Sequence, residues 1–319
     1  MQIRPIMTQS IHTGCFATRL SGTGRVVAAT IMAALVLAWP SAAPAEEGPA
    51  PANGKQWEVD SEHIFGFTEG SDIGEKGEKE LELEPSAAFG KRGGFYAATS
   101  TDLMLKYTVT DSFRVAPLVS FASHNISNVP GLEDRDQFRF QGIGAEIRYR
   151  LLNREHDPFG FTLSASPNQS NVDGTTGLPA TSYSSEFAAL LDKTLIPDRL
   201  FAGFNIVYEP EWTRLRATGE WERSSTFGVS GALSAQLFPG LLVAGEVRYM
   251  RAYDGIGLNT FLGDALFVGP NLYMQVTKDW LVTIAWNAQV AGRAVGEPGP
   301  LDLTNFNRNE VLMRISTGF

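Results

Sequence analysis

The last thirteen residues of the chain, Asn307 to Phe319, alternate in character from one position to the next. Apolar or small side chains stand at every second position, and the residues between them are mostly polar: Val311, Met313, Ile315, Thr317 and Phe319, against Glu310, Leu312, Arg314 and Ser316. A period of two is that of a β-strand with two different faces. The sequence therefore predicts a C-terminal strand whose apolar face carries the last residue, Phe319.

The first 45 residues have the pattern of an export signal. Their only charged residues are arginines, an apolar stretch runs from Val26 to Trp39, and the small-residue site Ala43 to Ala45 follows. The apolar stretch is short for a membrane-spanning helix, which needs about 20 residues. We therefore predict a signal peptide over 1–45 and exclude it from the fold.

Removal of the signal leaves 23 basic and 35 acidic residues, a net charge of −12. An acidic exported protein is a poor partner for nucleic acid. The only cysteine, Cys15, leaves with the signal, so the mature chain has no disulfide and no cysteine metal site. We expect no cofactor and no metal. No long apolar run follows the signal, so a closed barrel is the route by which this chain could enter a membrane.

From residue 79 onward, strand-like stretches of roughly ten to fourteen residues repeat. They are 79–88, 95–109, 112–124, 137–151, 158–168, 182–194, 200–211, 224–237, 241–252, 264–277, 280–292 and 307–319. A tilted membrane strand needs about 9–11 residues. The sequence therefore predicts an all-β fold over 79–319, a transmembrane antiparallel up-and-down β-barrel of about 12 strands.

The connections between these stretches alternate in length. The short ones contain Pro, Asp or Gly, as in Ile196 to Arg199 and Phe238 to Gly240, and an aromatic residue or leucine follows each. Most of the others are long, polar and glycine-rich: 125–136, 169–181, 212–223, 253–263 and 293–306. Outer-membrane barrels have short periplasmic turns and long extracellular loops. An even strand count then places both ends of the barrel domain on the periplasmic side.

The two faces of the predicted strands differ in polarity. One face carries residues such as Phe113, Val115, Trp280 and Trp286, and the opposite face carries residues such as Ser230 and Asn287. A soluble β-sandwich shows the same alternation, but the signal, the loop asymmetry and the terminal phenylalanine favour a membrane barrel with apolar residues facing lipid. In 137–151 the phase changes, which predicts a β-bulge near Gly142 to Gly144.

Residues 46–78 are rich in glycine, proline and charge. Two placements are open: a flexible N-terminal periplasmic extension, which the composition favours, or a segment folded into the barrel lumen. The acidic and glycine spacing does not fit a calcium-binding loop with ligands at alternating positions.

The predicted inward faces carry charges of both signs. The candidate lumen-lining residues are Glu80, Glu82, Glu84, Asp102, Lys106, Arg114, Arg139, Glu146, Arg148, Arg150, Glu186, Glu246, Arg248, Glu310 and Arg314. They could line a narrow polar pore, or they could pair with one another in a packed lumen. Three glutamates on the first strand face only Arg314, and arginines cluster on the third and fourth strands. This arrangement predicts a transverse field suited to small polar or zwitterionic solutes.

One stretch, Ser123 to Asn128, distantly resembles the His/Ser stretches of outer-membrane phospholipases and lipid A deacylases. Those hydrolases place the two residues two apart on one face. Here His124 and Ser127 are three apart, which directs them to opposite faces of a strand. We predict no catalytic residue and no enzyme, with a lipid hydrolase kept as a second alternative.

From about Glu80 to Phe319 the chain resembles Gram-negative outer-membrane β-barrel proteins, which end on an alternating strand with a terminal aromatic residue. In those proteins the barrel-assembly machinery reads this ending, so Phe319 is a candidate assembly signal. Size and turn style are similar to outer-membrane transporters of the meta-pathway phenol-degradation barrel type. The resemblance implies location in the cell outer membrane, contact with its lipid, and a pore or transporter for small solutes. The first alternative is a structural or surface-binding barrel without conductance.

Overall fold

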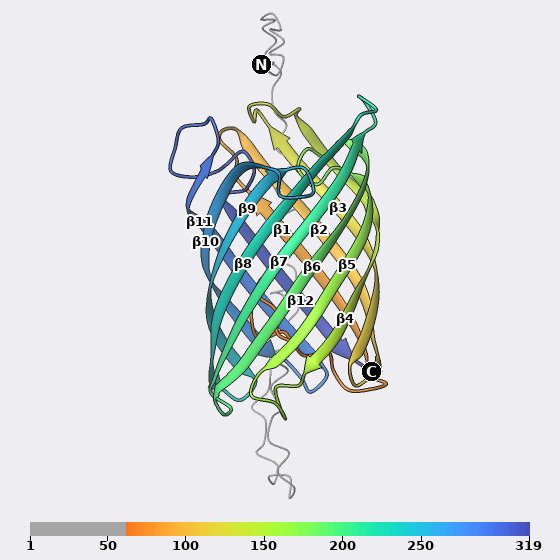
Figure 1. The fold of residues 1–319 in the computed structure, drawn as a ribbon, viewed down its shortest axis with the longest axis vertical. Helices are drawn as coiled ribbons and strands as arrows, with labels where there is room; N and C mark the ends of the chain where they lie inside the picture. Colours follow the sequence, from red (N-terminus) through yellow and green to blue (C-terminus); the bar gives the residue numbers. More distant parts are fainter. Residues whose placement is uncertain (1–61) are drawn as a thin grey trace, which may run out of the picture. The chain divides into compact units, whose positions relative to one another are not determined.

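The computed structural model describes residues 62–319, which form one closed barrel of antiparallel strands (Figure 1). The strands are β1 (Lys79–Phe89), β2 (Phe95–Thr110), β3 (Phe113–Ser127), β4 (Arg135–Leu152), β5 (Gly160–Val172), β6 (Pro179–Ile196), β7 (Leu200–Leu215), β8 (Trp221–Phe238), β9 (Leu241–Asp254), β10 (Thr260–Gln275), β11 (Trp280–Ala294) and β12 (Asn309–Gly318). Each pairs with its neighbours in the chain, and β1 pairs with β12 to close the barrel. The predicted twelve-stranded antiparallel barrel is therefore confirmed. The predicted signal peptide lies outside the described residues.

All twelve predicted strand ranges coincide with observed strands, but several observed strands are longer. β4, β6 and β8 each have 18 residues. A strand that only crosses a bilayer needs about 9–11 residues, and the extra residues continue the pairing mainly toward the end with the longer connections. The sequence pattern detects the alternating part of each strand and misses these extensions.

The predicted turns take the backbone conformations that their residues favour. In the turn between β6 and β7, Asp198 has a φ of 56°, and Gly240, between β8 and β9, has a φ of 79°. Asp and Gly are among the residues that tolerate positive φ. These short turns gather at the end of the barrel where Figure 1 marks the C-terminus.

The outer wall is apolar and the interior is polar. Phe138, Trp286 and Val290 are each about half or more exposed, although they are large and apolar. Lys106, Arg114 and Asn287 are buried inside. A soluble protein shows the reverse, whereas a barrel in lipid must pair every backbone group and turn its apolar side chains outward. The fold is thus that of a transmembrane β-barrel. Within residues 62–319 no helix is long and apolar enough to span a membrane.

The predicted bulge is present in β4. Ser120 pairs with Gly142 while the next residue, Phe121, pairs with Phe140, so Gln141 is the extra residue. It lies one position before the predicted Gly142 to Gly144. The bulge turns Phe138 and Phe140 outward together with Ile143 and Ile147, and Phe121 contacts both phenylalanine rings.

Residues 62–78, which we call the luminal segment, lie inside the barrel (Figure 1). Ile64 and Phe65 are fully buried and pack against Phe201, Leu242 and Tyr273 of the barrel wall. At the opposite end, part of the 295–308 connection also contacts the interior, because the Gln289 side chain donates hydrogen bonds to the carbonyl oxygens of Asp302 and Asn307, at 3.0 and 3.1 Å. The interior is therefore partly filled from both ends.

The candidate pore and its luminal segment

Small residues in the wall make room for the luminal segment. The Phe65 ring lies against Gly203 of β7, where an added Cβ would come within 2.9 Å of a ring carbon. At Gly160 of β5, an added Cβ would lie 1.9 Å from Ser71 Oγ. The close approach of segment and wall at these two positions requires glycine in the wall. The wall and the segment therefore fit each other closely.

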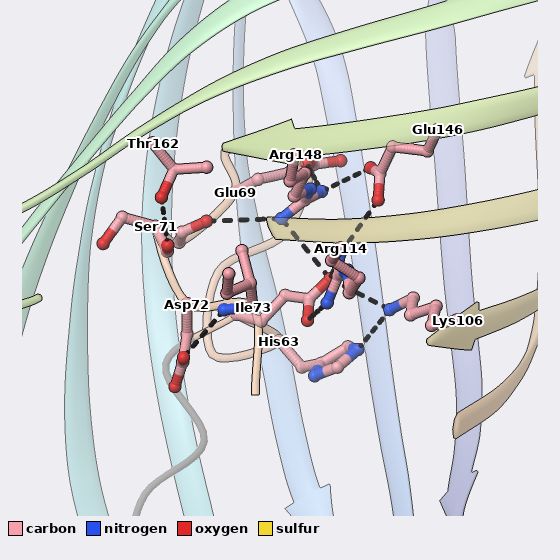
Figure 2. A network of polar contacts seen from close by, with 12 residues as sticks. His63, Glu69, Ser71, Asp72, Ile73, Lys106, Arg114, Glu146, Arg148 and Thr162 are labelled. Atoms are coloured by element: carbon pink, nitrogen blue, oxygen red, sulfur yellow. Dashed lines mark hydrogen bonds and ion pairs between the residues drawn. The ribbon is translucent and has the colours of Figure 1, made fainter. Parts of the chain in front are cut away.

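Acidic residues of the luminal segment meet the basic residues of β2, β3 and β4 (Figure 2). Both guanidinium Nη atoms of Arg114 donate to the carboxylate of Glu62, one of them at 2.7 Å. Arg148 pairs with Glu69 and, at 2.7 Å, with Glu146. Arg150 donates to Asp72 at 3.0 Å. Bidentate arginine–carboxylate pairs of this kind are strong and directional.

Lys106 of β2 is surrounded by four acceptor groups. Its Nζ lies 2.9 Å from Glu62, 3.0 Å from Glu80, 2.9 Å from Glu82 and 3.1 Å from His63 Nε2. His63, Glu80 and Glu82 lie close enough together to hold a metal ion. The positive charge that a metal ion would bring is already supplied by the lysine ammonium group, so this cluster is an ion-pair network rather than a vacant ligand set.

The backbone of the luminal segment is also held by side chains of the wall. Glu246 accepts hydrogen bonds from the backbone N–H groups of Phe67 and Thr68, at 3.1 and 2.8 Å. Arg314 donates to the carbonyl oxygen of Gly66 at 2.7 Å. Backbone groups buried away from strands need such partners.

Taken together, the contacts of the luminal segment reach every strand of the barrel. One partner from each strand, in order from β1 to β12, is Glu82, Lys106, Arg114, Arg148, Thr162, Asp192, Asn205, Ser230, Glu246, Tyr273, Thr283 and Arg314. The segment therefore crosses the whole section of the lumen at its level.

The predicted lumen-lining residues divide into three groups. Those in ion pairs or hydrogen bonds with the luminal segment or with one another are Glu80, Glu82, Glu84, Lys106, Arg114, Glu146, Arg148, Arg150, Glu246, Arg248, Glu310 and Arg314. Asp102 and Glu186 line a cavity and form no ion pair within residues 62–319. Arg139 is exposed at the bulged end of β4, away from the other arginines of the predicted basic wall.

The predicted transverse field between an acidic and a basic wall needs correction. Glu62, Glu69 and Asp72 of the luminal segment form ion pairs with arginines of β3 and β4, while Lys106 forms ion pairs with two glutamates of β1. These segment residues were not among the predicted lumen-lining residues. The apolar residues in the run Ile64 to Phe67 were the sequence signal for a buried segment, because an extension in water would leave them exposed.

Two cavities lie beside the luminal segment, of about 220 and 260 Å³. Glu69, Glu84, Glu186 and Arg314 line both, so the two are adjacent. Each is large enough for several waters, since one water occupies roughly 30 Å³ of liquid volume. Their polar and charged walls favour hydration.

Two carboxylates of the first cavity stand directly opposite each other. Ser184 pairs with Glu211 and Phe187 with Tyr208, which places Glu186 of β6 opposite Glu209 of β7. Both side chains line the cavity, and neither forms an ion pair within the described part of the chain. Like charges at opposed positions of neighbouring strands are destabilising. This part of the lumen therefore holds two carboxyl groups that have no cationic partner within residues 62–319.

His124 and Ser127 do not form a hydrolytic pair. His124 points inward, is buried, and its Nε2 lies 2.9 Å from the carbonyl oxygen of Gly174. Ser127 belongs to the opposite phase of β3, and its Oγ accepts a hydrogen bond from Asn128. The predicted separation of these two residues onto opposite faces matches this geometry.

Phe319 lies at the seam between β12 and β1. Its backbone N–H donates to the carbonyl oxygen of Lys79 at 3.0 Å, and its side chain is 73% exposed. The terminal ring is therefore on the outer surface of the barrel, on the lipid-facing side of the closing strand.

The closed barrel, its apolar outer wall and its charged interior define a transmembrane β-barrel of the outer-membrane class. The protein is therefore located in the outer membrane. The family model of DUF6662, a family of unknown function, matches residues 57–319, and the chain belongs to that family.

Solved structures with a similar fold are outer-membrane barrels. The COG4313 outer membrane channel from Pseudomonas putida F1 is 12% identical, with a TM-score of 0.52, and the match covers 78% of this chain and 98% of that one. The beta domain of the Bordetella autotransporter BrkA is 11% identical, with a TM-score of 0.49 and coverage of 76% and 100%. The NanC porin is 14% identical, with a TM-score of 0.43 and coverage of 75% and 98%. A comparison with curated proteins found no match.

Proposed function

We propose that this protein is an outer-membrane channel for the passive passage of small polar solutes, with the luminal segment as a built-in constriction. The observation that carries the proposal is the pair of adjacent polar cavities beside that segment. A purely structural barrel of this size could fill its interior with side chains. The resemblance in size and turn style to transporters of the meta-pathway phenol-degradation type supports the same role.

The constriction restricts the size of the solute. Because the luminal segment contacts every strand, no wide aqueous channel passes its level. Solutes pass only through the hydrated space beside the segment or when the segment loosens. Conductance is therefore expected to be small or intermittent compared with the wide barrels of 16–18 strands.

The charge of the cavities indicates the preferred solutes. Glu84 and Glu69 pair with arginines, whereas Asp102, Glu186 and Glu209 have no cationic partner within residues 62–319. Carboxylates with no protein partner are stabilised by water or by cations. We therefore expect the channel to favour cations and small polar solutes over anions.

Planar-bilayer recording of the full-length protein tests this proposal. Discrete current steps with a cation preference support a channel. A silent bilayer contradicts it and favours a structural or surface-binding barrel, a role that the contacts of the luminal segment with all twelve strands would also suit. A silent bilayer together with lipid hydrolysis that His124→Ala abolishes would instead identify a lipid hydrolase.

A further inference from the structure

A cluster of basic and aromatic residues lies on the outer surface, near the end of the barrel with the long connections. Arg251 of β9 continues the outward-facing series of Val247 and Tyr249, and Arg293 of β11 is exposed. Both arginines pair in register with Asp264 of β10, from its two sides. Three neighbouring strands thus present one outward cluster, which is separate from the lumen.

The two guanidinium groups are held by aromatic rings. The Cζ atom of Arg251 lies 4.6 Å from the centre of the Phe261 ring and 5.3 Å from that of Tyr253. The Cζ atom of Arg293 lies 5.8 Å from the centre of the same Phe261 ring. Such cation–π contacts fix the position of a guanidinium group while its N–H donors stay free to bind.

Neither arginine is neutralised by a carboxylate. Arg251 and Arg293 form no ion pair within residues 62–319, although Asp264 stands between them. Asp264 instead accepts a hydrogen bond from the Tyr249 hydroxyl at 3.2 Å. Arg251 Nε is buried and has no hydrogen-bond acceptor. The cluster therefore has an excess of positive charge and an unused donor, on a protein whose net charge is −9.

The height of the cluster along the barrel wall indicates which part of the bilayer surrounds these N–H donors. Leu241 begins β9 at the short-turn end, and Arg251 is ten residues further along the strand. Ten residues at about 3.3 Å each and a tilt of about 40° rise roughly 25 Å, the height of the apolar band of an outer-membrane barrel. Arg251 then lies where the acyl chains end and the headgroups of the outer leaflet begin. An arginine facing lipid is costly at the centre of the bilayer but not at this level.

We propose that Arg251 and Arg293 form a binding site for the phosphate groups of an outer-leaflet lipid. Guanidinium groups bind phosphate oxygens through paired N–H donors. The exposed ring of Tyr249, two residues nearer the short-turn end than Arg251, contacts the upper part of the acyl region, as aromatic belts do. The site takes a lipid rather than a free phosphate, because its arginines sit on the lipid-facing wall with apolar residues directly below them.

Binding of diphosphorylated lipid A to the purified full-length protein in detergent tests the site, with dephosphorylated lipid A and inorganic phosphate as comparison ligands. The double variant R251Q/R293Q should bind diphosphorylated lipid A roughly tenfold more weakly than the native protein, through loss of charge-assisted hydrogen bonds. The matched control R199Q/K278Q removes the same charge from exposed positions in the short turns at the opposite end. It should bind like the native protein, and heat modifiability on gels confirms that each variant is folded.

Three results would overturn the proposal. The first is equal binding of diphosphorylated lipid A by R251Q/R293Q and the native protein. The second is an equal loss in R199Q/K278Q, which would indicate a general charge effect. The third is equally tight binding of inorganic phosphate, or of the dephosphorylated lipid, by the native protein. Bilayer recording and lipid binding test the two proposals separately. A conducting protein that does not bind lipid A contradicts only this inference, and a silent protein that binds lipid A contradicts only the proposed function.

Discussion

Arg114 of β3 holds Glu62 of the luminal segment with both of its Nη atoms, one at 2.7 Å from Glu62 Oε1, and both side chains are buried. Lys106 and Arg148 also lie within ion-pair distance of the same carboxylate. One acidic side chain near the start of the segment therefore contacts three cations of the wall. This relationship makes Glu62 the residue whose removal should loosen the segment most.

Glu62→Gln should increase single-channel conductance and lower thermal stability. The substitution keeps the shape of the side chain but removes one carboxylate shared by three buried cations, and loss of one partner of a buried ion pair costs up to about 3–5 kcal/mol. Planar-bilayer recording and thermal unfolding followed by circular dichroism measure the two effects. Glu75→Gln is the control, because Glu75 is exposed in the same segment. Equal conductance of both variants would mean that Glu62 does not hold the constriction.

Gly203→Ala should displace Phe65 from its place against β7. The new Cβ would meet ring carbons at 2.9 to 3.1 Å, and the ring is fully buried. Overpacking of this kind costs about 1–3 kcal/mol. Gly245→Ala on β9 is the matched control, since nothing lies within 4 Å of its added Cβ. We expect a lower melting temperature for Gly203→Ala alone, and a similar loss in both variants would contradict the fit between ring and glycine.

The double variant E186Q/E209Q should reduce the cation preference of the channel. A unit charge about 6 Å from a passing ion contributes roughly 0.7 kcal/mol or more, so at a pH where both carboxyl groups are ionised the permeability ratio should fall at least about threefold at low salt. Reversal potentials across a salt gradient measure this ratio. E155Q/E220Q removes the same charge from exposed positions in two connections and should leave the ratio unchanged. An unaltered ratio in E186Q/E209Q, with conductance intact, would place these carboxylates off the solute path.

Deletion of Phe319 should reduce the amount of inserted barrel far more than Phe113→Ala. Phe319 ends the strand that closes the barrel, and its N–H pairs with Lys79 of β1. Phe113 also begins a strand near the short turns, but it only contributes one side chain to the outer wall. Heat-modifiable protein in the membrane fraction measures insertion. Equal yields of the two variants would show that the terminal residue has no special part in assembly.

Lys91, in the connection between β1 and β2, should make stability rise with pH. Burial lowers the pKa of Lys91 to about 8, although Asp302 and Glu310 act in the opposite direction. A free lysine titrates near 10.4, so between about pH 8 and pH 10.4 the unfolded chain binds more protons and stability increases with pH. The melting temperature of the native protein should therefore rise relative to that of Lys91→Met from pH 7.5 to pH 10. Parallel curves of melting temperature against pH for the native protein and Lys91→Met would contradict this. Lys278→Met is the control, because Lys278 is exposed.

The barrel could be predicted from the sequence because its signals are local. Each strand has its own alternation, and each short turn has its own Pro, Asp or Gly. The phase change between Phe140 and Ile143 predicts the bulge at Gln141. The strand ends were less accurate, since residues such as Pro179 and Trp221 extend the ladder beyond the alternating part.

The contents of the lumen could not be predicted in the same way. Alternation identifies Arg114 and Arg148 as inward-facing, but it does not say what they face. Their partners Glu62 and Glu69 lie in a stretch without strand periodicity, where composition favoured an extension. Glu186 and Glu209 were likewise visible as inward residues, but their direct opposition depends on the register of β6 against β7.

The luminal segment also bears on the seam where the barrel closes. Between β1 and β12 the ladder skips Glu84 and Pro85 without a change of register, and proline has no N–H to donate to a ladder. Near this gap, His63 binds Glu82 of β1 while the Gly66 carbonyl accepts a hydrogen bond from Arg314 of β12. The segment thus clamps the two edge strands together from within. A barrel sealed in this way resists lateral parting toward the lipid, so its contents are expected to enter and leave along the axis rather than through the wall.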